Sequence, residues 1–148
     1  MKKENSNIQS TKITTEYIMS YEAPLDPPLA IDEGMMIVNV REGGWVAGPK
    51  INGKFIAPGA DWLRIMPSGN FRLDVRGLIK TDDDAYIYVE YSGRADMESN
   101  LIAAAPTFQT GSKKYDWLNK IQVVAAGEID TKAALTYTLY EVIVSSND

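Results

Sequence analysis

The chain has 148 residues and a net charge of −5 at neutral pH, with 45% apolar and 24% charged residues. This length suits one domain with a single core, and the acidic balance argues against a nucleic-acid binder, because phosphate recognition needs a basic patch. The chain has no cysteine and no histidine, which excludes thiolate catalysis, Ser-His-Asp catalysis and the metal sites built on those residues. Any catalysis therefore depends on Asp, Glu, Tyr, Lys or Arg. We expect no metal site and no cofactor.

The N-terminal segment "MKKENSNIQS" is polar and lacks the apolar stretch of a secretion signal. No apolar run approaches the roughly 20 residues that a membrane helix needs. We therefore expect a cytoplasmic protein without a membrane partner. Residues 1–11 are expected to be disordered, and residues 12–145 to form a single domain.

Short segments rich in Val, Ile, Tyr and Thr alternate with turn residues at intervals of about ten, a pattern typical of an antiparallel sandwich or barrel. In chain order, the predicted strands are Lys12–Tyr21, Gly34–Arg41, Pro49–Ile56, Asp61–Met66, Phe71–Lys80, Ala85–Tyr91, Trp117–Ala126 and Ala133–Ser145. Closing the sheet removes its exposed edges, so the number of strands favours a barrel over a sandwich. The fold class is thus an all-β, single antiparallel barrel of about eight or more strands built from consecutive hairpins.

Local signals predict the connections between these strands. The three prolines of "APLDPPLAIDE" mark a loop, and the Asn-Gly pair of "INGK" (Ile51 to Lys54) favours a type I′ hairpin turn. The segment "DMESNLIAAA" (Asp96 to Ala105) is the one predicted short helix, which ends at Pro106. The acidic run of residues 82–84 is interpreted as a charged hairpin turn rather than a metal cluster.

Two turns decide which side chains share a face of the predicted sheet. "MPSGN" reads as a three-residue loop with Gly69 left-handed, and "TDDDA" reads the same way with Asp84 left-handed. Arg64 then lies opposite Arg72, and Arg76 lies opposite Glu90. One face carries Trp62, Arg64, Arg72, Asp74, Arg76, Tyr86, Tyr88 and Glu90; the other carries Leu63, Ile65, Phe71, Leu73, Val75, Ile79, Ile87 and Val89.

Two interpretations of the polar face remain open. In the first it is wet, and the apolar face fills the core, as in most half-buried sheets. In the second it lines the lumen of the barrel, because bare Trp and Tyr rings and arginines suited to anion recognition are unusual on a merely solvated surface.

The order of several short motifs resembles the family known as domain of unknown function 3237, also called the UPF0311 proteins. These motifs are "GGWVAGPKINGKFIAPGADW", "RLDVRGLIKTDD", "YIYV" and "YDWLN". The family usually has Gly at the position of Asp84. The resemblance implies an antiparallel barrel that self-associates, as a homodimer or other homo-oligomer, and it favours the interpretation in which the polar face lines the lumen.

The main functional hypothesis is a barrel that binds a small anionic, partly aromatic molecule in its lumen. The alternative is an enzyme that uses the same site for isomerase- or cyclase-type proton transfer without a cofactor, and a second alternative is a structural or assembly module with a filled core. The predicted catalytic residues are Asp74, Arg76 and Tyr88. The predicted ligand-binding residues are Trp62, Arg64, Arg72, Tyr86, Glu90, Trp117 and Asn119, the last of which is equally interpretable as a cap of a local bend.

Overall fold

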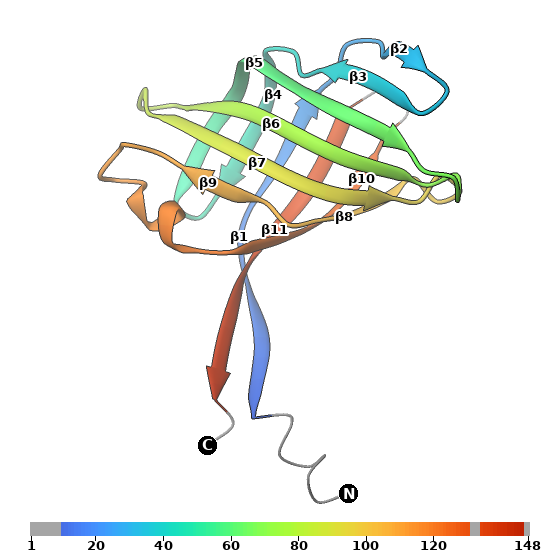
Figure 1. The fold of residues 1–148 in the computed structure, drawn as a ribbon. Helices are drawn as coiled ribbons and strands as arrows, with labels where there is room; N and C mark the ends of the chain where they lie inside the picture. Colours follow the sequence, from blue (N-terminus) through green and yellow to red (C-terminus); the bar gives the residue numbers. More distant parts are fainter. Residues whose placement is uncertain (1–9, 131–133, 147–148) are drawn as a thin grey trace, which may run out of the picture.

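The computed structural model describes residues 10–130 and 134–146, which form a closed antiparallel barrel of eight strands (Figure 1). The ring of strands runs β1-β11-β10-β8-β7-β6-β5-β4 and closes from β4 back to β1. This confirms the predicted all-β, antiparallel barrel. The barrel strands are β1 (Thr11–Pro24), β4 (Gly43–Gly48), β5 (Ile51–Ile65), β6 (Phe71–Thr81), β7 (Tyr86–Ala95), β8 (Leu101–Ala104), β10 (Val123–Ile129) and β11 (Ala134–Ser146).

Strand β5 closes the barrel because it pairs with β4 on one side and with β6, the other end of the ring, on the other side. Its first part pairs with β4, and its second part pairs with β3 (Met35–Asn39), while both parts pair with β6 on the other side. The register between β5 and β6 shifts between Ile56 and Ala60, where the strand bends. The short strand β2 (Leu29–Asp32) extends the sheet beyond β3, and β9 (Thr107–Gln109) pairs with β7.

Both predicted turns next to β6 are confirmed. The N–H of Met66 donates to the carbonyl of Asn70, Gly69 has a φ of 90°, and Arg64 lies opposite Arg72. In the second turn Asp84 has a φ of 70°, and Arg76 lies opposite Glu90.

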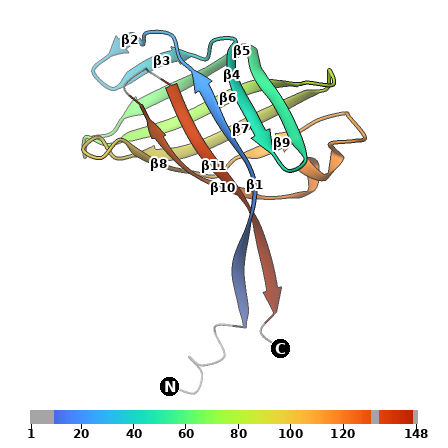
Figure 2. The same ribbon diagram turned by 180° about the vertical axis from the view of Figure 1, so that it is seen from behind.

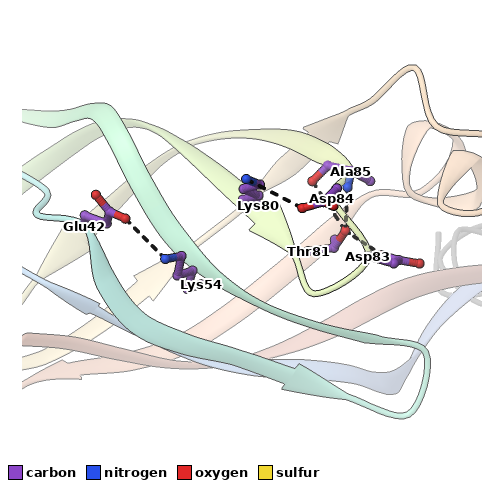
Figure 3. Close-up of polar contacts among 7 residues, drawn as sticks. All are labelled: Glu42, Lys54, Lys80, Thr81, Asp83, Asp84 and Ala85. Atoms are coloured by element: carbon purple, nitrogen blue, oxygen red, sulfur yellow. Dashed lines mark hydrogen bonds and ion pairs between the residues drawn. The ribbon is translucent and has the colours of Figure 1, made fainter.

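Figure 3 shows the side chains that hold this second turn. The hydroxyl of Thr81 donates to Asp83 over 2.7 Å and accepts from the N–H of Ala85 over 2.8 Å. Lys80 forms an ion pair with Asp84 at 3.6 Å. A second pair in the same view, between Lys54 and Glu42 at 3.2 Å, ties β5 to the residue before β4.

The apolar face of these strands fills the barrel. Leu73, Ile79 and Ile87 are at most 1% exposed, whereas Arg64, Arg72 and Asp74 are exposed on the outside. The interpretation in which the polar face lines the lumen is therefore wrong. A barrel of eight strands is narrow enough for the apolar side chains to fill its interior. If the charged face pointed inward instead, several charged groups would be buried without water.

Several local predictions are wrong, and one of them is the loop "APLDPPLAIDE", in which Leu29–Asp32 form strand β2. The segment predicted as a helix contains a turn over Asp96–Asn100 followed by strand β8, which pairs with β7 on one side and with β10 on the other. The hairpin turn between β4 and β5 lies at Pro49–Lys50 instead of Asn52–Gly53. The predicted strand Trp117–Ala126 begins as a 3-10 helix, η1 (Asp116–Lys120), before β10.

A two-stranded ribbon projects from the barrel wall, as Figures 1 and 2 both show. It consists of the first part of β1 and the last part of β11, which pair from Thr11↔Ser146 to Glu16↔Glu141. The pairing of β1 with β4 includes only Ser20 to Glu22, so β4 does not reach the ribbon. We call residues 11–16 and 141–146 the arm.

Within residues 10–130 and 134–146, no helix is long and apolar enough to cross a membrane. Residues 1–9, where disorder is predicted, lie outside the described residues, as does Ala133, the first residue of the last predicted strand. Strands β1 and β11 otherwise include the predicted first and last strands.

Candidate functional site

Most of the predicted site residues come together, but they do so on the outer face of β5, β6 and β7. Trp62, Arg64, Arg72, Asp74 and Arg76 border an open groove of about 670 Å³ there. The guanidinium of Arg76 lies over the Trp62 ring, 5.5 Å from its centroid. We call this depression the outer groove; its remaining lining residues are Met35, Met66, Leu73 and Ser92.

The other predicted residues do not line the outer groove, although Glu90 lies directly opposite Arg76, and Tyr88 borders a second depression of about 370 Å³ together with Trp62 and Arg76. Tyr86, Tyr88 and Glu90 share its outer face farther along β7, and Tyr86 is 59% exposed. Trp117 lies on η1 and packs against the core, with Lys50 over its ring. Asn119 makes two hydrogen bonds to the backbone of Thr110, of 2.8 and 2.9 Å, which fit the cap of a bend.

A buried carboxyl group lies inside the barrel, directly behind this outer face. Asp61 is only 3% exposed, and its neighbours on the same side of β5 are apolar. Its Oδ1 accepts a 2.9 Å hydrogen bond from the backbone N–H of Asp74. Burial raises the pKa of Asp61 from 3.8 to about 6, against the opposing effect of this hydrogen bond. A carboxyl group with this pKa can donate or accept a proton near neutral pH.

Asp61 borders an apolar cavity of about 170 Å³ at one end of the barrel. We call it the barrel-end cavity. The connection between β1 and β2 covers it, together with β3, and five barrel strands form its walls. Its lining residues are Leu25, Asp26, Pro28, Met36, Val38, Asp61, Leu63, Phe71, Leu73, Ala95, Ile129 and Leu135.

Three buried tyrosines lie deeper in the barrel. The rings of Tyr21 and Tyr91 each pack edge-on against Tyr137, with centroid distances of 5.4 and 5.3 Å. Burial raises the pKa of all three, and the Asp61 carboxylate raises the pKa values of Tyr91 and Tyr137 further. Their hydroxyls therefore stay protonated. The hydroxyls of Tyr21 and Tyr137 are buried without a hydrogen bond of good geometry in the described part of the chain.

The sequence reasoning missed Asp61 and the three tyrosines. A signal for Asp61 was present, because the alternation of β5 places it on the same face as Leu63 and Ile65. A carboxylate in an apolar row is unusual and marks a buried acid. The tyrosines gave no such signal, because strand tyrosines are common on either face. Among the described residues, no group of three or more acidic side chains is placed to hold a metal ion.

Related proteins fit the same fold. A UPF0311 protein of Clostridium acetobutylicum is 29% identical over 152 residues, covering 84% of this chain and 96% of its own. The hydroalkoxylation enzyme phnH of Penicillium herquei is 30% identical over 109 residues, covering 72% of this chain and 68% of its own.

Solved structures show the same architecture. A protein of unknown function from C. acetobutylicum superposes with a TM-score of 0.80 at 24% identity, over 89% of this chain and all of its own. A crystal structure of an enzyme from P. herquei gives a TM-score of 0.66 at 26% identity, over 88% and 95% of the two chains. The model of the family described as "Protein of unknown function (DUF3237)" matches residues 13–142. This chain therefore belongs to the DUF3237 family, which includes the UPF0311 proteins.

Proposed function

We propose that this protein is an enzyme that moves a proton on a small, largely apolar, uncharged molecule bound in the barrel-end cavity, with Asp61 as the acid and base. The observation that carries this proposal is the Asp61 carboxyl group, which is buried at the wall of a largely apolar cavity. Such a group is costly in a purely structural role, and perturbed acids in cavities are frequent at catalytic sites.

The size of the cavity supports a substrate with one ring. An apolar cavity of about 150 Å³ holds a benzene molecule, and the barrel-end cavity has about 170 Å³. Its walls offer apolar contacts from Leu63, Leu73 and Phe71. Of its two aspartates, Asp61 is the buried one, whereas Asp26 is partly exposed and pairs with Arg41. An anion would meet the Asp61 carboxylate without a compensating cation in the cavity, so the proposal names an uncharged molecule.

The relative from P. herquei suggests the type of reaction. Hydroalkoxylation adds the O–H bond of an alcohol or phenol across a carbon–carbon double bond. The oxygen forms a bond to one alkene carbon and loses its proton, and the other alkene carbon gains a proton. When both groups belong to one molecule, the product is a cyclic isomer and no atom is lost. Asp61 can supply the proton to carbon when neutral and remove the proton from oxygen when ionised.

The proposal assigns proton transfer to Asp61 instead of the predicted Asp74, Arg76 and Tyr88. These three side chains do not border the barrel-end cavity. Binding of an anionic ligand by the arginines of the outer groove stays a separate prediction. The raised pKa values of Tyr91 and Tyr137 make them donors that can stabilise charge near Asp61.

The test uses 2-allylphenol, which carries a hydroxyl group and a double bond in one uncharged molecule. We expect this probe to raise the melting temperature and to be converted slowly to its cyclic isomer, 2-methyl-2,3-dihydrobenzofuran, as followed by gas chromatography. Asp61→Asn should bind the probe but lose turnover. Ala95→Leu, which fills the cavity, should lose binding.

Asp74→Asn is the discriminating variant, because its side chain lies on the outside of the same wall. If Asp61 is the acid and base, Asp74→Asn should keep turnover. If catalysis takes place at the outer groove, Asp74→Asn should lose turnover. Equal turnover by Asp61→Asn and wild type would reject Asp61 as the acid and base. Equal binding by Ala95→Leu and wild type would reject the cavity as the site.

A further inference from the structure

The outer edge of β1 in the arm has no pairing strand among residues 10–130 and 134–146. Within the described part of the chain, residues 11–16 of β1 pair only with β11, so the other edge of β1 presents N–H and C=O groups that no described strand pairs. Ile13 and Val144, which lie opposite each other, are 67% and 65% exposed. An isolated two-stranded ribbon is marginally stable in water, whereas three or more strands are stable.

The charges on the arm follow a simple pattern. Lys12, Thr14 and Glu16 lie on one face of β1, and all three are exposed. Glu16 lies directly opposite Glu141 of β11, and among the described residues neither has an ion pair. Like charges in this position are destabilising, so the base of the arm lacks a cation. Lys12, near the tip, also has no ion pair in the described chain.

We propose that the arm of a second copy of this chain covers this edge, with the two β1 strands paired antiparallel about a two-fold axis at Thr14. Lys12 of each copy then lies opposite Glu16 of the other copy, in the same cross-strand row as Glu141. The two arms together form a four-stranded sheet that joins the two barrels. The arrangement is self-complementary, as a two-fold interface requires.

The register follows from the charges. Residues directly opposite each other in two antiparallel strands have side chains on the same face of the sheet. The two-fold axis must therefore pass through a residue position, and moving it by one residue shifts the partner of each residue by two. Centring the axis on Ile13 or Thr15 would place Lys12 opposite Thr14 or Ile18. Only the axis at Thr14 pairs both lysines with glutamates. The outer edge of β11 offers no such match, because its one charged residue in the arm is Glu141.

Charge reversal tests the pairing. We expect sedimentation equilibrium to show a dimer for wild type and a dissociation constant at least tenfold higher for Lys12→Glu and for Glu16→Lys. The double variant Lys12→Glu/Glu16→Lys should restore the wild-type constant, because it recreates both ion pairs with the signs exchanged. Lys120→Glu makes the same change of charge on exposed η1 and should leave the constant unchanged.

A cross-link tests the register directly. The chain has no cysteine, so Thr14→Cys carries the only thiol. Paired strands place opposite Cα atoms about 4.5–5.5 Å apart, within the range that a disulfide spans. Oxidation should give a covalent dimer of Thr14→Cys and a monomer of Ser145→Cys, which places the thiol on β11. Far-ultraviolet circular dichroism verifies the fold of each variant.

Three results would overturn the proposal: a wild-type protein that stays monomeric at millimolar concentration, a double variant as weak as the single ones, or more efficient cross-linking of Ser145→Cys than of Thr14→Cys. The proposal does not depend on the function of Asp61. The Asp61→Asn variant should dimerise like wild type.

Discussion

The backbone N–H of Asp74 donates a 2.9 Å hydrogen bond to the carboxylate of Asp61, although the two side chains lie on opposite sides of the barrel wall. One aspartate faces water among arginines, and the other faces an apolar cavity. Strand alternation thus gives two neighbouring carboxyl groups different properties. Burial away from water raises the pKa of Asp61.

Asp61 should make stability depend on pH. Its pKa rises from 3.8 to about 6 on folding, so the folded state holds the proton more tightly, and the stabilisation is complete below pH 4 and lost as the pH rises through 6. We expect the free energy of unfolding of wild type, relative to the uncharged Asp61→Asn, to fall by about 2 kcal/mol between pH 4 and 7. Urea unfolding at several pH values measures this difference. A constant difference would mean that Asp61 is not shielded from water.

Two tyrosine variants should have opposite effects on stability. The buried hydroxyl of Tyr21 has no hydrogen bond of good geometry in the described chain, so Tyr21→Phe should leave stability unchanged or raise it by up to about 1 kcal/mol. The hydroxyl of Tyr115 donates a 2.8 Å hydrogen bond to Asp83, so Tyr115→Phe should lower stability by about 1 kcal/mol. Urea denaturation gives both values. A loss on Tyr21→Phe would show that this hydroxyl has a bound partner, such as water.

Gly127 should be essential for the packing of the tyrosine cluster. A Cβ atom at this position would overlap the Tyr137 ring, so Gly127→Ala forces the ring to move and should cost about 1–3 kcal/mol. Gly111→Ala is the matched control, because a Cβ atom there has no neighbour within 4 Å. Thermal unfolding of both variants tests this. Similar melting temperatures would show that Tyr137 moves aside without cost.

Three arginines of the outer face repel one another. Arg72 lies between Arg64 of β5 and Arg94 of β7 in the pairing of the strands, and none of the three has an ion pair among the described residues. Arg72→Gln should therefore stabilise the protein by about 0.2–1 kcal/mol at low salt. The gain should shrink at high ionic strength because salt screens exposed charges. Destabilisation by Arg72→Gln would mean that the row has an attractive partner, such as an anion from the buffer.

The sequence was sufficient to predict the part of the fold that depends on local pattern. Turn residues at Gly69 and Asp84 determined the register of β5, β6 and β7, and alternation separated the two faces correctly. The prediction of which face is inside was wrong, because it gave more weight to exposed rings and arginines than to burial. Trp62 remains half-buried outside the barrel, with Arg76 over its ring.

Long-range pairing explains the remaining errors. "LIAA" has good helix formers, but β7 and β10 both offer hydrogen bonds to it, and pairing outweighs local preference. The Asn-Gly signal failed because Gly53 is needed where β5 lies against the Lys80 carbonyl, 2.5 Å from an added Cβ atom. The cavity itself depends on distant segments, from Leu25 to Leu135, that no local pattern brings together.

The first and last described strands are neighbours, from Thr11↔Ser146 to Pro24↔Ala134. The hydrogen bonds between the strands of the barrel therefore do not depend on which connection between neighbouring strands is cut. A short linker between the two ends would turn β11 and β1 into one more hairpin, and new ends could open in the exposed loop Pro67–Gly69. Such a circular permutant would keep the wall of the barrel, with the tip of the arm closed by a covalent loop.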